Sequence, residues 1–208
     1  TDLGNVNHIL RGIRFPEGVT TNLLDPCCGT GAALKRLAVG NNCFTYGVEL
    51  DEGRAAEAQD TLHRVGVGSF FGSQISWGAF HLVFLNPPYL SVMTENGRSR
   101  DEKRFLLHSI PHLMLGGLMV YIVPYYRLTE DICKILCDNL ADISVYRFMD
   151  EEFKKFKQVA VLGVRREKTD SGAAGRKLEA MACAPDSFPS LDRLEAERYA
   201  LPAEPRKV

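Results

Sequence analysis

The sequence predicts a Rossmann-like α/β fold, with a seven-stranded, mostly parallel sheet that has an antiparallel edge strand and helices on both faces. Apolar, strand-like runs alternate with amphipathic segments along most of the chain, which is typical of parallel βαβ units. A glycine-rich turn follows the first strong run. The last two runs, over 143–148 and 158–164, have no helix predicted between them, so we expect 158–164 to insert there in the antiparallel sense.

Each element of the first half follows from apolar periodicity and from its breakers. Ile9 and Ile13 fall on one side of a helix that Pro16 and Gly18 end, and Asp51 can cap a later helix that is rich in alanine and glutamate. In chain order, we predict a helix over 6–15, a strand over 22–25, a helix over 31–39, a strand over 44–50, a helix over 52–65 and a weak strand over 68–73.

The second half begins with an apolar run over 80–85 and continues through a polar stretch that predicts a loop over 91–100. Pro111 interrupts the next helical pattern, and Thr129 can cap the helix that follows the fifth strand. We predict strands over 80–85, 118–123, 143–148 and 158–164, and helices over 103–115 and 130–140.

The pattern divides the chain into one domain over 1–166 and a linker-like, mobile tail over 167–208. Glycine and alanine dominate 171–175, prolines recur beyond residue 184, and one helix is predicted over 191–199. Because the chain starts with Thr1 directly before a helix, we expect it to be a trimmed piece of a longer protein.

Composition limits the possible partners and compartments. The 208 residues carry a net charge of −1, so a nucleic-acid partner would need a local basic patch. Arg98, Arg100, Lys103 and Arg104 could supply one, although a solvated loop is an equally good interpretation. The six cysteines lack zinc-site spacing, which predicts reduced thiols, a cytoplasmic location and no metal. The sequence has no apolar run long enough for a membrane span.

The segment Asp25-Pro26-Cys27-Cys28-Gly29-Thr30-Gly31 follows the first strand and predicts a cofactor site. Its glycines let a ligand approach the backbone closely. A dinucleotide fingerprint would have a third glycine where this chain has Leu34, and Asp25 would repel a pyrophosphate. S-adenosylmethionine carries a sulfonium and an ammonium group but no phosphate, so it suits an acidic turn.

Residues at the ends of the next two strands complete this prediction. The Glu49 carboxylate can accept both ribose hydroxyls, although it could also be a simple surface carboxylate. Leu50 could pack on the adenine. No aspartate stands at the third strand, so Ser73, Gln74 or backbone groups are left to bind the adenine amino group.

The run Asn86-Pro87-Pro88-Tyr89 follows the fourth strand and predicts the acceptor site. The lone pair of an amine on a ring or carbonyl is delocalised, and acceptors aimed at its N–H groups would draw it toward a tetrahedral, nucleophilic geometry. The Asn86 side-chain oxygen and the Pro87 carbonyl can serve as these hydrogen-bond acceptors, and Pro88 stiffens the loop that holds them. Tyr89 offers a face on which a flat group can stack. An ordinary Asn-Pro turn is the alternative.

These residues resemble class I S-adenosylmethionine-dependent methyltransferases of the amino type, over residues 5–166. The resemblance implies that Asp25, Cys28, Gly29, Gly31 and Glu49 bind the cofactor and that Asn86, Pro87 and Tyr89 act in catalysis. The order of the motifs is similar to that of adenine-N6 methyltransferases, and the chain also looks like a poorly characterised NPPY group of bacteria and mobile elements. Two departures are the lack of an N-terminal segment with an aromatic for the methionine part and of a target-recognition region.

The resemblance leaves several functions open. Adenine N6 of DNA is the favoured acceptor, ahead of RNA, and NPPY also occurs in enzymes that methylate ribosomal guanine amines or a glutamine of release factors. A cofactor-binding module without catalysis, inside a larger assembly, is an alternative of another class. A nicotinamide oxidoreductase is the weakest alternative, because the third glycine is missing and NPPY is present.

Overall fold

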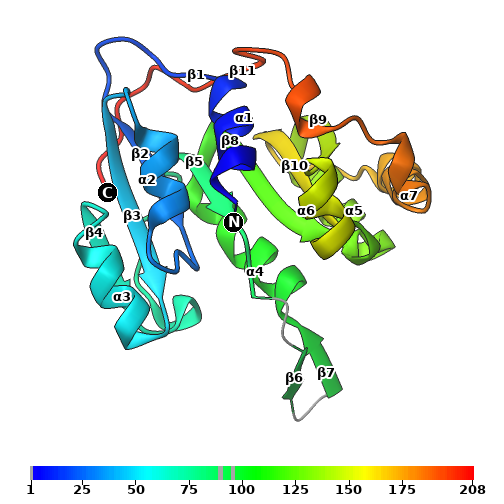
Figure 1. Ribbon diagram of the computed structural model, residues 1–208, viewed down its shortest axis with the longest axis horizontal. Coiled ribbons are helices and arrows are strands. Elements are labelled where there is room, and N and C mark those ends of the chain that lie inside the picture. The colour runs from blue at the N-terminus through cyan, green and yellow to red at the C-terminus, as the bar shows by residue number, and fades with distance from the viewer. Residues whose placement is uncertain (1, 89–90, 95–96) are drawn as a thin grey trace.

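One seven-stranded sheet forms the centre of the computed structural model, which describes residues 2–88, 91–94 and 97–208 (Figure 1). Across the sheet, the strands are β4 (Arg64–Val67), β3 (Cys43–Glu49), β2 (Thr21–Asp25), β5 (Phe80–Leu85), β8 (Leu113–Pro124), β10 (Gln158–Arg165) and β9 (Leu140–Arg147). Each strand from β4 to β8 pairs in parallel with the next strand in this order.

The antiparallel insertion predicted for the end of the sheet is confirmed. Strand β10 lies between β8 and β9 and is antiparallel to both, with Val161 opposite Tyr121 on one side and Val145 on the other. Every residue of β5 and most residues of β8 and β10 are buried, as expected for central strands that are covered on both faces.

Helices flank the sheet, as predicted. They are α1 (Leu3–Arg11), α2 (Ala32–Ala38), α3 (Glu52–Gln59), α4 (Asp101–Ser109), α5 (Glu130–Asn139), α6 (Asp150–Phe156) and α7 (Gly172–Ala182). Side chains cap two of them, because the Asp2 carboxylate accepts from the Asn5 N–H at 2.8 Å and the Asp51 carboxylate from the Arg54 N–H at 2.9 Å. In Figure 1, α1 and α2 lie in front of the sheet, and α5 and α7 pack together beside β9.

The third strand is displaced from its predicted position. Strand β4 ends at Val67, which lies opposite Glu49, and the predicted strand over 68–73 is wrong. Gly68 has a φ of 129°, and a single 3₁₀ turn follows at Phe70–Gly72. The chain thus turns at the carboxyl end of β3, at the edge where the predicted site residues lie.

Other predicted elements also need correction. The helices predicted over 6–15 and 52–65 end at Arg11 and Gln59, and short strands occupy 13–14 and 64–67. The helix over 103–115 ends at Ser109, and a 3₁₀ turn at Ile110–His112 contains Pro111 and leads directly into β8. The predicted loop over 91–100 contains two short antiparallel strands, β6 (Ser91–Thr94) and β7 (Gly97–Arg100). Helix α6, which the sequence analysis did not expect, lies between β9 and β10.

The segment after residue 166 has defined elements. Helix α7 packs on α5, and the predicted helix over 191–199 is wrong, because that stretch holds a 3₁₀ turn (Leu191–Arg193) and then β11 (Tyr199–Ala200). Strand β11 pairs in parallel with β1 (Ile13–Arg14). Leu191, Leu194 and Tyr199 are fully or almost fully buried. The domain boundary at residue 166 and the mobility of residues 167–208 stay predictions.

Candidate active site

A cavity of about 760 Å³ opens at the carboxyl ends of β2, β3 and β5. This is the edge at which loops of an open parallel sheet bind ligands. It brings together most of the residues predicted from the sequence, namely Asp25, Cys28, Gly29, Glu49, Leu50, Asn86 and Pro87. Gly31 and Ser73 are not among its lining residues, and Tyr89 lies outside the described residues.

Asp25 is a buried carboxyl group on the wall of this cavity. Its side chain accepts a hydrogen bond from the Cys27 N–H at 3.0 Å, and Asp25 as a whole is 2% exposed. Burial raises the pKa of Asp25 to about 7. A cation bound nearby would favour the ionised form, so the group is suited to a positively charged ligand.

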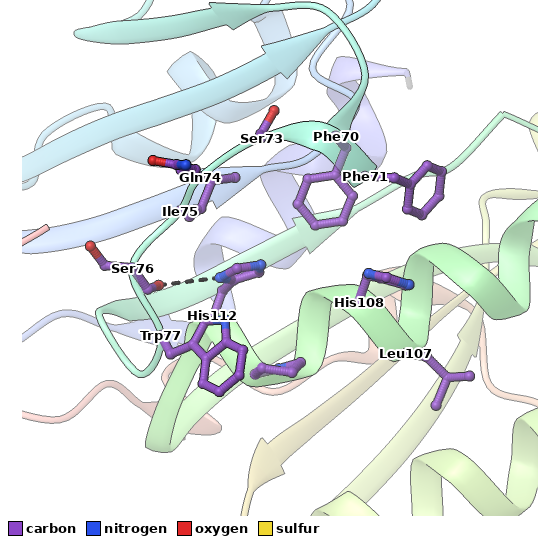
Figure 2. Close-up of a pocket in the computed structure, with 11 residues that line it drawn as sticks. Phe70, Phe71, Ser73, Gln74, Ile75, Ser76, Trp77, Leu107, His108 and His112 are labelled. Carbon is purple, nitrogen blue, oxygen red and sulfur yellow. Dashed lines mark hydrogen bonds between the residues drawn. The ribbon is translucent and has the colours of Figure 1, made fainter.

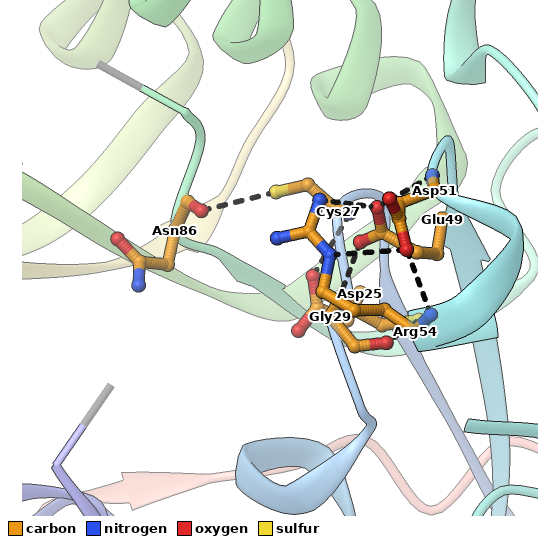
Figure 3. Close-up of polar contacts among 8 residues, drawn as sticks. Asp25, Cys27, Gly29, Glu49, Asp51, Arg54 and Asn86 are labelled. Carbon is orange, nitrogen blue, oxygen red and sulfur yellow. Dashed lines mark hydrogen bonds and ion pairs between the residues drawn. The ribbon is translucent and has the colours of Figure 1, made fainter. Parts of the chain in front are cut away.

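Glu49 ties the loop after β2 to the end of β3. One of its carboxylate oxygens accepts from the Gly29 N–H at 2.8 Å. The other accepts from the Asp51 N–H at 2.9 Å and from the Arg54 guanidinium at 2.8 Å (Figure 3). The carboxylate is therefore fixed by two backbone groups and by one side chain that is 58% exposed.

The two glycines of the first motif have different surroundings. Gly29 has a φ of 56°, and a Cβ atom there would meet no other atom within 4 Å. Gly31 has a φ of 79° and begins α2, but a Cβ atom there would lie 2.8 Å from the Leu62 side chain. Gly29 thus leaves open space in the cavity, whereas Gly31 allows close packing behind it.

A thiol joins the first motif to the Asn86 loop. The Cys27 Sγ donates to the main-chain oxygen of Asn86 at 3.1 Å, and Figure 3 shows the Asn86 side-chain amide on the other side of the backbone from Cys27. Burial raises the pKa of the Cys27 thiol well above its usual range and that of Cys28 to about 12. Both cysteines are therefore neutral thiols, and Cys27 holds the two loops at a fixed spacing.

An aromatic wall, made of Phe70, Phe71 and Phe105, closes one side of the cavity. The rings of Phe70 and Phe105 are stacked with centroids 5.7 Å apart, and Phe71 lies 4.7 Å from Phe105. The guanidinium of Arg104 stands over the Phe71 ring at 3.8 Å. This wall was not among the features predicted from the sequence, although the adjacent pair Phe70-Phe71, three residues after the third strand, was a usable signal.

A second cavity of about 700 Å³ shares Phe70 and Phe71 with the first, and Figure 2 shows the residues that line it. Ser73 and Gln74, which were predicted to bind adenine, line this cavity, and the Ser73 hydroxyl donates to the Ser69 carbonyl at 3.0 Å. Ser69 and Phe70 line the first cavity instead, and they replace Ser73 and Gln74 as the candidate residues for an adenine end. The reason is the displaced third strand, which ends six residues before Ser73.

The residues that the structure describes contain no group of three or more histidine, cysteine, aspartate or glutamate side chains placed to hold a metal ion. None of their helices combines the length and apolar character that a membrane span requires.

Comparison with protein families gives a match over residues 1–204 to an uncharacterised methyltransferase family, DUF6094. No curated protein matches the chain. The tRNA (m1A58) methyltransferase TrmI of Aquifex aeolicus aligns with a TM-score of 0.53 and 16% identity, over 71% of this chain and 63% of that one. The chain thus covers less than two thirds of that enzyme.

Two more solved structures are similar. A Listeria monocytogenes protein assigned as an S-adenosylmethionine-dependent methyltransferase has a TM-score of 0.58 at 13% identity, over 80% of this chain and all of that one. Geranyl diphosphate C-methyltransferase of Streptomyces coelicolor, crystallised with S-adenosyl-L-homocysteine, has a TM-score of 0.55 at 14% identity, over 79% and 80%. The predicted fold and the predicted cofactor, S-adenosylmethionine, are confirmed.

Proposed function

The chain belongs to the DUF6094 family of methyltransferases, and from this premise we propose that it moves a methyl group from S-adenosylmethionine to a planar exocyclic amine. Adenine N6 of DNA is the proposed acceptor. The observation that supports the proposal best is that one cavity is lined both by the Asp25–Thr30 loop with Glu49 and by Asn86–Pro88.

The cofactor half of the cavity suits a cation with a sugar attached. Asp25 would face the charged methionine part, and the Glu49 carboxylate would accept the ribose hydroxyls. Gly29 leaves room beside both, and Cys28 and Leu50 complete the lining. Gly31 would act indirectly, by positioning the loop against Leu62. The cofactor supplies a methyl group on a sulfonium, which needs no metal to activate it.

The acceptor half is proposed to work by positioning. The Asn86 side-chain oxygen and the Pro87 carbonyl would accept hydrogen bonds from the two amine hydrogens, which localises the nitrogen lone pair. The nitrogen would take the methyl group and lose its proton to water, and the electrons of the broken S–C bond would remain with the sulfur. Cys27 would keep Asn86 at a constant distance from the cofactor loop. Stacking of the target on Tyr89 stays a prediction.

A base in duplex DNA would have to leave the stack to reach this cavity. An unpaired RNA base would need no such step, and the name of the Aquifex relative gives tRNA as its substrate. RNA is therefore the second candidate. A glutamine side chain presents a similar planar amide and is the third.

A transfer assay with a tritiated-methyl cofactor and separate pools of DNA, RNA and release-factor protein tests this proposal. We expect label in DNA, and label in protein alone would reject a nucleic-acid acceptor. Asn86→Ala should lower transfer by roughly 10²–10³-fold, by analogy with the loss of one hydrogen-bonding group that stabilises a transition state. Its affinity for S-adenosylhomocysteine should stay unchanged.

The exposed Asn42 offers a matched control. Asn42→Ala removes the same amide from the opposite end of the sheet and should leave both transfer and cofactor affinity intact. If Asn86→Ala loses cofactor binding together with transfer, Asn86 is a structural residue and the acceptor half of the proposal is wrong. If no acceptor is labelled while the cofactor binds, the chain is a binding module without catalysis.

A further inference from the structure

Arg104 is a cation at the mouth of the cavity whose charge no acidic side chain balances among those the structure describes. It lies in α4, is exposed, and lines the same cavity as Asn86. Its neighbours in sequence and space are paired, because Lys103 lies 2.7 Å from Asp131 and the Glu102 carboxylate 3.3 Å from Arg127. The other cation that lines the cavity, Arg54, is bound to Glu49.

The aromatic wall holds Arg104 in place. Its guanidinium stands 3.8 Å from the centre of the Phe71 ring, and Phe71 is packed against Phe105 at 4.7 Å and against His108 at 5.1 Å. A guanidinium that uses its face for an aromatic ring keeps the N–H groups of its edge available. Those groups form a planar fork that matches two oxygens of a phosphate.

We propose that Arg104 is an anion-binding residue that selects a phosphate-bearing acceptor, by contacting the backbone phosphate beside the base held at Asn86. This inference rests on the proposed function and narrows its substrate class to a nucleotide in a strand. A neutral glutamine amide would bring no anion to Arg104. Lys103, which the sequence made an equal candidate for phosphate contact, is occupied by Asp131.

The cofactor's own carboxylate is the competing anion for the same cavity. Asp25 and Gly29 mark the proposed methionine end, whereas Arg104 stands on Phe71, next to the Ser69–Phe70 turn proposed for the adenine end. The phosphate of the acceptor is therefore the favoured partner. A test must measure cofactor and acceptor separately, so that the two anions give different results.

The test compares Arg104→Gln with Lys103→Gln, the same change at the neighbouring residue of α4. Binding of a short single-stranded DNA that contains one adenine is followed by fluorescence anisotropy at several salt concentrations, with S-adenosylhomocysteine present. For Arg104→Gln we expect roughly 5- to 10-fold weaker binding and a salt slope smaller by about 0.7, as for one lost phosphate contact on a single strand. Lys103→Gln should match the wild type.

The affinity for S-adenosylhomocysteine, measured by calorimetry, should be the same in all three proteins, and Arg104→Lys should restore part of the DNA affinity. The inference is overturned if Arg104→Gln matches Lys103→Gln on DNA, or if it weakens S-adenosylhomocysteine binding as much as DNA binding. If the oligonucleotide binds through Arg104 but accepts no methyl group, the proposed function fails and the anion site stands. If Arg104→Gln methylates the oligonucleotide as well as the wild type does, the anion site fails and the proposed function stands.

Discussion

The two ends of the parallel strands bury polar groups in opposite ways. At the amino ends, His81 of β5 accepts from the Asn22 N–H at 3.0 Å through Nδ1 and donates to the Glu204 carbonyl at 2.9 Å through Nε2. The Asn22 amide donates to the carbonyls of Ala79 and Arg206. At the carboxyl ends, the buried Asp25 faces a cavity and has a raised pKa.

The difference separates stability from function. Fixed backbone partners satisfy His81 and Asn22, so their burial costs little and fastens residues 204–206 to the sheet. Asp25 is buried before its ligand arrives, and its charge is therefore disfavoured in the free protein. Sites that await a ligand commonly carry such a cost in stability. We expect substitutions at the two ends to have effects of opposite sign.

The largest effect is expected for Asp25→Asn. Burial raises the pKa of Asp25 in the folded state from its ordinary value of 3.8 to about 7, so the folded state holds the proton more tightly and stability falls as pH rises from about 4 through 7. The shift corresponds to roughly 4 kcal/mol. Asp25→Asn should therefore raise the free energy of urea unfolding at alkaline pH and flatten its pH dependence.

The same variant should bind S-adenosylmethionine much more weakly, and wild-type affinity should rise as pH increases through about 7. Calorimetry over this pH range measures both effects. A variant that is more stable and still binds the cofactor with wild-type affinity would remove Asp25 from the site.

The second effect concerns the amino end. His81→Leu keeps a similar volume but leaves the Asn22 N–H and the Glu204 carbonyl without their partner, which should cost roughly 2–3 kcal/mol of unfolding free energy. Cofactor affinity and transfer per folded molecule should stay at wild-type levels. A selective loss of transfer in stable protein would show that the two ends of the sheet are coupled.

The pH dependence of stability at His81 has the sign opposite to that of Asp25. Burial lowers the pKa of His81 below its ordinary value of 6.5, so the unfolded chain binds the proton more tightly. The stability that neutral His81 contributes to the folded state is therefore lost as pH falls below about 6.5. His81→Leu should abolish that acid sensitivity. Urea unfolding at mildly acidic pH, compared with neutral pH, measures it.

These two ends also show how far the sequence could predict the molecule. The apolar runs and motif spacing located Asp25, Glu49 and Asn86 at one edge, because parallel strands bring their carboxyl ends together. Ser73 was misplaced, because a single glycine, Gly68, turns the chain earlier than the weak strand pattern indicated. The His81 network and the Arg104–Phe71 contact join residues far apart in the chain, and no local pattern reports such pairs.

A matched pair of glycines gives the third prediction. Gly31→Ala should be destabilising by roughly 1–3 kcal/mol, because its left-handed backbone is strained by a side chain and its Cβ atom would overlap Leu62. Gly29→Ala shares the strain but meets open space, so it should cost only about 1 kcal/mol. Cofactor affinity should show the reverse order, with the greater loss for Gly29→Ala. Equal losses of affinity would mean that neither glycine borders the cofactor.

The smallest effect is expected at Arg54. A carboxylate has about four lone-pair sites, and Glu49 already uses three, for Gly29, Asp51 and Arg54. Two ribose hydroxyls would then need one donor to leave, and the half-exposed Arg54 side chain can move whereas the backbone groups cannot. Only the Arg54 end of this ion pair is exposed, and we take its release to cost about 1 kcal/mol, so Arg54→Gln should tighten S-adenosylhomocysteine binding by roughly two- to five-fold. Lys35→Gln, an exposed change on α2, should have no effect. Weaker binding by Arg54→Gln would instead make Arg54 a cofactor ligand, and the carboxyl end would then be less open than the cavity indicates.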